Sequence, residues 1–128
     1  MQSLPPYAQF LGLQTLRAED GALTWLMPFA DHVVGRPGYL QGGAIAGLLE
    51  FAALGSLADA LGETAGIALK PINVTVTFMR GGVIHDTFAS AAITRLGQRV
   101  ANVEAHAWQQ DRAKPIASAQ MNVLLKRQ

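Results

Sequence analysis

The stretch Gln41–Asp59, QGGAIAGLLEFAALGSLAD, decides how this chain folds. It opens with the pair Gly42-Gly43 and continues with small and apolar residues, among which Glu50 is the only ionisable side chain before the closing Asp59. Apolar residues recur along this stretch at both the i+3 and the i+4 spacing. The pattern therefore predicts a helix that is buried on nearly every side and ends at Gly62. Such a helix needs a sheet to cover it.

Strand-like segments flank the helix on both sides. A short helix or turn is expected at 3–13, and two short runs joined by a Glu-Asp-Gly turn predict a hairpin, at 14–18 and 22–27. After a loop at 28–40 and the helix, alternation predicts a half-buried strand at 72–79. Three β-capable segments with short connections then predict an antiparallel meander, at 85–95, 99–110 and 115–126. The fold class is therefore α+β. A long central helix wrapped by a curved antiparallel sheet is the economical architecture, and a two-layer α+β sandwich is the alternative.

The composition favours one domain that associates with itself. The 128 residues fit a single domain spanning 1–128, and the combination of 50% hydrophobic with 15% charged residues predicts a homo-oligomer that hides apolar surface. Basic residues are scattered and the net charge is +1, so nucleic acid is not an expected partner. The absence of cysteine excludes disulfides and thiolate chemistry, and it is compatible with a cytoplasmic location.

Residues 44–61 are apolar enough to raise the alternative of a membrane span. The mid-span Glu50, several glycines and the lack of flanking basic or aromatic anchors argue against it, so no membrane partner is expected. The N-terminal segment has no basic region, and Pro5-Pro6 interrupts the apolar run that a signal peptide needs. We therefore interpret it as mature sequence.

Two features of the predicted helix point to chemistry. The main-chain N–H groups of Gly42 and Gly43 at a helix start are unobstructed by side chains, and the helix dipole adds positive charge there, so they can polarise a carbonyl. Glu50 stands in apolar surroundings, where a carboxylate needs a partner or becomes a stronger base. The alternatives for Glu50 are neutralisation by Arg80 or Arg95, or a position at a solvated edge.

The spacing of these features predicts a dimer. Gly43 and Glu50 lie seven residues apart, which is about 10 Å along a helix axis. They cannot easily act on one atom within one chain. If both serve one reaction, they must come from different, antiparallel helices, and a symmetric dimer then has composite sites at its interface.

The string GGAIAGLLEFA at 42–52 resembles the His-Gly-Gly-(six residues)-Asp/Glu signature of the hotdog-fold thioesterases of the phenylacetate-degradation (PaaI-like) type. Downstream, NVTVTFMR at 73–80 resembles that family's strand ending in Phe-Leu-Arg-Pro, and ASAAITRLGQR at 89–99 its Ala-x-Ala-x-Val-x-Arg-x-Gly-Arg run. The resemblance extends from residue 38 to the C-terminus. It implies the hotdog fold, with subunits paired edge to edge as a homodimer and often as two stacked dimers.

The resemblance also implies hydrolysis of acyl-CoA thioesters at the dimer interface, with no metal and no cofactor besides the CoA of the substrate. The amide of Gly43 or of Gly42 would polarise the thioester carbonyl, and Glu50 of the facing subunit would activate water or attack directly. Gln41 stands where the family has histidine, and it can still donate a hydrogen bond. Gly35 stands where the family commonly has a substrate-binding Asn or Gln.

Further candidates for substrate contact lie on the strands and their connections. Three arginines are candidates for binding CoA phosphates, Arg80, Arg95 and Arg99. Two polar residues on the less apolar face of their strand are candidates for an acyl-pocket wall, Asn73 and Thr75.

Two other functions remain open. A non-catalytic hotdog protein that binds acyl-CoA or another small acyl ligand is suggested by the changed residues Gln41 and Gly35. A hotdog dehydratase is less favoured, because Arg36 stands where that enzyme has its histidine and His32 is displaced along the chain. His32, like His85 and His106, is interpreted as a structural residue, and no set of residues has metal-ligand spacing.

Overall fold

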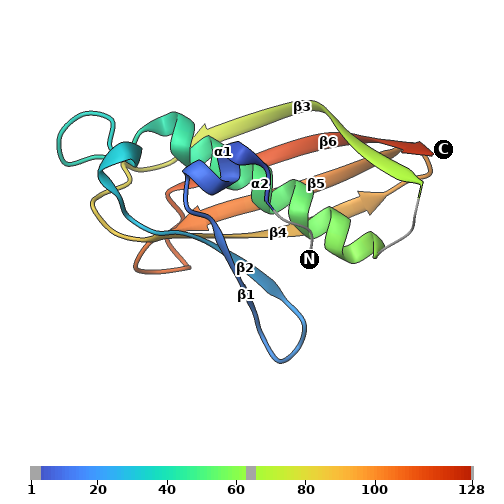
Figure 1. Ribbon diagram of the computed structural model, residues 1–128, viewed down its shortest axis with the longest axis horizontal. Helices are drawn as coiled ribbons and strands as arrows, with labels where there is room; N and C mark the ends of the chain where they lie inside the picture. The colour runs from blue at the N-terminus through green and yellow to red at the C-terminus, as the bar shows by residue number, and fades with distance from the viewer. Residues whose placement is uncertain (1–3, 63–65, 128) are drawn as a thin grey trace.

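The structure, a computed structural model, describes residues 4–62 and 66–127. A long helix lies across one face of a six-stranded sheet, and a short helix lies over the long one (Figure 1). In chain order the elements are α1 (Pro6–Phe10), β1 (Gln14–Arg17), β2 (Leu23–Met27), the 3-10 helix η1 (Asp31–Val33), α2 (Gly42–Leu61), β3 (Ile67–Phe78), β4 (Thr87–Leu96), β5 (Val100–Trp108) and β6 (Ala117–Arg127). The predicted hairpin, central helix and meander are therefore confirmed.

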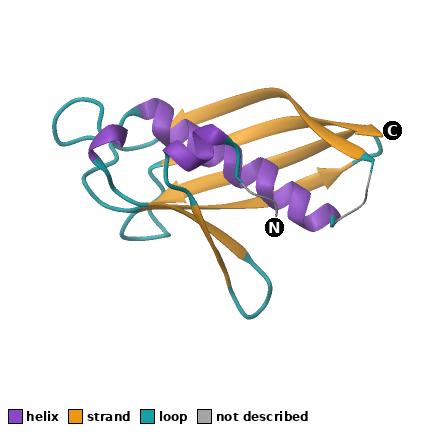
Figure 2. Ribbon diagram, in the orientation of Figure 1, coloured by secondary structure: helices purple, strands orange, loops and turns teal. Residues whose placement is uncertain are grey.

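The sheet is antiparallel throughout, in the order β1-β2-β4-β5-β6-β3. Figure 2 shows α2 running diagonally across the strands. Many of the buried side chains that the strands contribute to the core are small, and they are Ala89, Ala101, Ala105, Ala107, Ala117 and Ala119. Because these side chains are short, the helix approaches the sheet closely and its leucines fill the space between them.

Helix α2 begins and ends as predicted. The side chain of Gln41 caps it by accepting a hydrogen bond from the N–H of Ala44 at 2.8 Å, and Gly62 ends it with a positive φ of 72°. The prediction of burial on nearly every side is wrong, because among the described residues the short α1 and the turn after it cover only part of the face that points away from the sheet. The buried residues are Ala44, Ile45, Gly47, Leu48, Leu49, Ala52, Ala53 and Leu57.

With a mean hydropathy of 1.6, α2 is long and apolar enough to cross a membrane by length and composition, as are core helices of soluble proteins. In this structure it packs against β2, β3, β4, β5 and β6. Its apolar face therefore has a protein environment.

Strand β3 begins at Ile67, five residues before the predicted start at 72. Pro71 concealed this start, because proline cannot donate a hydrogen bond to a sheet and is excluded from central strands. β3 tolerates Pro71 because it is an edge strand that pairs only with β6, and a bulge follows between Pro71 and Asn73. Within the described residues, the outer edge of β3 has no partner strand.

The β1–β2 hairpin holds the C-terminal half of α2. Trp25 packs on Gly55 so closely that a Cβ there would overlap the indole ring, and Trp25 Nε1 donates to Ser56 Oγ at 3.3 Å. Arg17 and Asp59 form a salt bridge of 2.7 Å near the helix end. These contacts fix α2 at one end of the sheet and leave its N-terminus at the other, beside the end of β3.

Candidate active site

The N-terminus of α2 presents two free main-chain donors. Within the described residues, the N–H groups of Gly42 and Gly43 have no acceptor, whereas those of Ala44 and Ile45 bond to the carbonyl of Gln41 at 3.0 and 3.3 Å. Both glycines are exposed. The helix dipole adds partial positive charge at this point, so the helix start can bind a carbonyl oxygen or an oxyanion.

Gln41 is held in place by its neighbours. Its backbone N–H donates to the carbonyl of Val33 at 2.8 Å, and Gly35 packs so closely that a Cβ there would lie 3.0 Å from the Cα of Gln41. Its Oε1 accepts from the N–H of Ala44, so Nε2 remains a donor beside Gly43 with no acceptor in the described part of the chain. Gly35 thus positions Gln41 and has no side chain to offer a ligand.

Phe78, the last residue of β3, lies beside the glycine pair. Its Cζ and Cε1 atoms are 3.5 and 3.7 Å from the position that a Cβ on Gly42 would occupy. The alternation along 72–79 already places Phe78 on the same sheet face as Val74 and Val76. No signal in the sequence joins Phe78 to Gly42, because the contact links two elements that are far apart in the chain.

Glu50 lies on the same face of α2 as Gly43, because seven residues complete nearly two helical turns. It is half-buried, and no hydrogen bond or ion pair among residues 4–62 and 66–127 involves its carboxylate. The sequence left open a neutralising Arg80 or Arg95, and the structure pairs neither with it. Glu50 is therefore an unpaired carboxylate two turns away from the free N–H groups.

Asn73 and Thr75 lie on the sheet face that points away from α2. Asn73 Oδ1 accepts from Asn122 Nδ2 at 2.9 Å, and Thr75 follows it on the same face. The structure therefore does not bring these two residues together with Gly43 or Glu50 within one subunit.

The three arginines lie at two ends of the sheet. Arg80 follows β3 at the end near Gly42, and its side chain is exposed. Arg95 pairs with Asn102 where β4 ends, and Arg99 lies in the connection to β5, at the opposite end of the sheet. Only Arg80 shares an end of the molecule with the glycine pair.

Each histidine has a partner inside the protein. His32 lies 2.7 Å from the last carbonyl of α1, and His85 lies 3.2 Å from a glutamine side chain. His106 lies 3.4 Å from Ser90 Oγ, and burial, followed by the charge of Arg112, lowers its pKa. In the described part of the chain, no group of three or more His, Asp or Glu residues could hold a metal ion.

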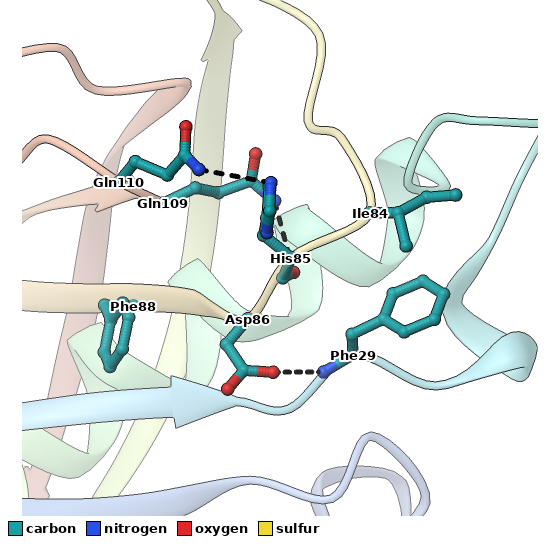
Figure 3. A pocket seen from close by; sticks show the side chains of 7 residues that line it. All are labelled: Phe29, Ile84, His85, Asp86, Phe88, Gln109 and Gln110. Atoms are coloured by element: carbon teal, nitrogen blue, oxygen red, sulfur yellow. Dashed lines mark hydrogen bonds between the residues drawn. The ribbon is translucent and has the colours of Figure 1, made fainter.

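A shallow depression at the start of β4 is the other candidate site (Figure 3). Its polar side chains bond to one another or to main chain: Asp86 accepts the N–H of Phe29 at 2.8 Å, and Gln109 Nε2 donates to the carbonyl of Val83 at 2.8 Å. None of the residues predicted to contact substrate lines it. The lining residues are Phe29, Ile84, His85, Asp86, Phe88, Gln109 and Gln110.

Comparison with solved structures supports the predicted fold. A Bacillus halodurans protein solved with CoA superposes with a TM-score of 0.88 and 18% identity, over 100% of this chain and 83% of that chain. A phenylacetic acid degradation-related protein from Ralstonia eutropha gives 0.82 and 22% identity, over 96% and 92%. A Chromobacterium violaceum protein gives 0.74 and 34% identity, over 94% and 83%. These likenesses confirm the hotdog fold rather than the two-layer sandwich.

Comparison at the level of sequence identifies the family. No curated protein matches the chain. The sequence model of the thioesterase superfamily matches residues 37–116, a segment that contains α2 with the glycine pair at its start and strands β3, β4 and β5. The chain therefore belongs to the thioesterase superfamily, as its resemblance to the PaaI-like thioesterases predicted.

Proposed function

We propose that this protein hydrolyses an acyl-CoA thioester to a free acid and CoA at a site shared by two subunits. One observation carries the proposal. The free N–H groups of Gly42 and Gly43 and the unpaired carboxylate of Glu50 lie on one face of α2, and seven residues separate Gly43 from Glu50. That separation is about 10 Å, so each feature needs a second subunit to complete it.

The glycine end binds the thioester carbonyl. The N–H of Gly43, assisted by that of Gly42, donates to the carbonyl oxygen, where negative charge develops during attack. Gln41 Nε2 is a third donor in the same place, because its Oε1 is already bonded to the N–H of Ala44. Gln41 thus supplies a hydrogen bond where the family has histidine.

Glu50 of the facing subunit supplies the base or the nucleophile. As a base, its carboxylate takes a proton from water while the water oxygen bonds to the carbonyl carbon. The tetrahedral intermediate then collapses, the C–S bond breaks, and the CoA thiolate receives the proton. As a nucleophile, the carboxylate would form a mixed anhydride that water hydrolyses, with the same products.

The open edge of β3 is the surface that brings the two halves together. Within the described residues β3 pairs with β6 alone, and its exposed side chains include Ile72 at 54%. A long, unpaired, apolar edge strand is suited to pairing with its own copy. A two-fold axis there makes the α2 helices antiparallel, so that the start of one faces Glu50 of the other. Two such dimers can stack into a tetramer.

Arg80 is the predicted substrate residue best placed for CoA. It is exposed and lies at the same end of the sheet as the glycine pair, where a guanidinium can bind a phosphate. The Bacillus halodurans structure was solved with CoA, which supports CoA as the carrier of the acyl group.

Thiol release from a panel of acetyl-, octanoyl- and benzoyl-CoA tests the proposal. The parent protein is expected to release CoA, and Glu50→Gln to lose roughly 100-fold or more in kcat, as for a missing general base. Glu104→Gln is the matched control, because Glu104 is an exposed carboxylate on β5 that, among the described residues, accepts a hydrogen bond from Gln120 alone. Full activity of Glu50→Gln would refute the assignment.

Binding without turnover is the second candidate, favoured by Gln41 in place of histidine. It predicts that acyl-CoA raises the melting temperature while no thiol appears over hours. Turnover by the parent protein that Glu50→Gln abolishes would eliminate it.

A further inference from the structure

We propose that Phe78 is a specificity-determining residue whose ring contacts the acyl group of the bound thioester. The inference rests on the proposed function and deepens it by naming the substrate class, which is acyl groups large enough to cover an aromatic ring.

The ring of Phe78 lies beside the glycine pair at the start of α2. Its ring lies 3.5 to 3.7 Å from the Cβ position of Gly42, one residue before the donor Gly43. Phe78 is nevertheless 54% exposed, because β3 is an edge strand and the glycine offers no side chain to cover the ring. The exposed part of the ring therefore adjoins the free N–H groups.

A thioester carbonyl bound by the N–H of Gly43 lies close to this ring. An oxygen bound by a main-chain N–H lies about 2.9 Å from the nitrogen, and its carbon lies about 1.2 Å beyond. Both substituents of that carbon then lie near Gly42, whose open Cβ position faces the Phe78 ring. The ring is therefore within reach of one of the two substituents, the acyl carbon or the sulfur.

The chemistry of the surroundings selects the acyl side. The pantetheine arm has amides and CoA has phosphates, which need polar or charged partners. Two exposed apolar side chains come from the adjoining segments: Met79, the next residue in the chain, at 48%, and Tyr39, which packs over Gly81, at 40%. An aromatic or medium-chain acyl group loses water on binding there, whereas an acetyl group is too short to cover the ring. The cations of this end, Arg80 and Arg36, are then left to the phosphates of CoA.

The test compares acyl groups of different size on single variants. For Phe78→Ala, the ratio of kcat/KM for octanoyl-CoA over acetyl-CoA, and for benzoyl-CoA over acetyl-CoA, should fall roughly tenfold. Phe78→Leu keeps an apolar side chain without a ring. It should retain most of the octanoyl ratio and lose the benzoyl ratio, and it guards against a folding defect in the alanine variant.

Leu96→Ala is the matched control. Leu96 is 53% exposed, but it ends β4 at the opposite end of the sheet, so its removal should leave both ratios unchanged. If Phe78→Ala lowers kcat/KM equally for all three substrates, the ring contacts the CoA arm and the inference is overturned. If kcat/KM is unchanged for all three, the ring contacts no part of the substrate, which overturns it as well.

Failure of the proposed function gives a different result. In that case the parent protein releases no thiol from any of the three esters, whatever residue stands at 78. The affinities of the parent and of Phe78→Ala for octanoyl-CoA and acetyl-CoA, measured by calorimetry, then decide the inference alone. A preference for octanoyl-CoA that Phe78→Ala removes supports the contact, and equal affinities overturn it.

Discussion

The carboxamide of Gln41 folds over the Cα of Gly43, so that a Cβ at Gly43 would lie 2.8 Å from Gln41 Oε1 and 3.1 Å from Nε2. The missing side chain of Gly43 therefore leaves room for this position of the Gln41 carboxamide, beside the free N–H group of Gly43. The same carboxamide caps α2 and supplies a proposed donor. Its Oε1 accepts the N–H of Ala44, and this hydrogen bond fixes the direction in which Nε2 points.

Gly43→Ala tests this relationship. The new methyl group must displace the Gln41 carboxamide, so we expect kcat for thioester hydrolysis to fall roughly tenfold or more. Gly42→Ala is the comparison, because its methyl group would meet only Phe78, at an ordinary 3.5 Å. We expect a much smaller loss from it. Equal losses in steady-state assays would show that the Gln41 contact has no part in catalysis.

Substitution of Gln41 separates its two roles. Gln41→Ala removes the cap and the donor, so the free energy of unfolding should fall by about 1 kcal/mol and kcat should fall roughly tenfold. Gln41→Ser can still cap α2, but its hydroxyl is too short to replace Nε2. It should be nearly as stable as the parent in urea titrations and as slow as Gln41→Ala. A fully active Gln41→Ser variant would contradict the donor role.

Gly55→Ala tests the contact that anchors the other half of α2. Alanine inside a helix is favoured over glycine by about 1 kcal/mol, but here its Cβ would overlap the Trp25 ring. We expect a net destabilisation of about 1–3 kcal/mol, as for an overpacked core. In a Trp25→Leu background the same substitution should become neutral or stabilising. Urea denaturation of the four proteins checks this cycle.

The pair of Arg17 and Asp59 predicts a pH dependence. The hydrogen bond from Arg17 is the main cause that lowers the pKa of Asp59 below the ordinary value of 3.8. A carboxyl with a lowered pKa in the folded state stabilises the protein above the unfolded value and loses that contribution as pH falls through the folded one. The stability difference between the parent and Asp59→Asn should therefore be present near neutral pH and vanish below the folded pKa. Because both side chains are exposed, added salt should reduce it.

The sequence was informative where a pattern is local. The apolar run with its terminal glycines predicts α2, and alternation predicts the strands, because both depend on neighbours in the chain. The start of β3 was missed at Pro71, since a proline is compatible with a strand only at a sheet edge and the edge is a property of the whole sheet. The start of β3 at Ile67 therefore depends on the strand order of the whole sheet.

Parts of the candidate site depend on contacts between distant segments. The free N–H groups and Glu50 follow from positions within one helix, so their spacing was predictable. The contact of Phe78 with Gly42, and of Gly35 with Gln41, joins separate elements and leaves no periodic signal. Asn73 accepts a hydrogen bond from Asn122 on β6. Both side chains lie on the sheet face that points away from α2.

The central claim is that Gly43 of one subunit and Glu50 of its partner form one site, and subunit mixing tests it most directly. Glu50→Gln and Gly43→Val should each be inactive as pure proteins. After equal amounts are unfolded and refolded together, about half of the dimers are mixed and each has one intact site, so about a quarter of the parental activity should return. If mixed dimers form and the thiol-release rate stays at the level of the single variants, the composite site is contradicted.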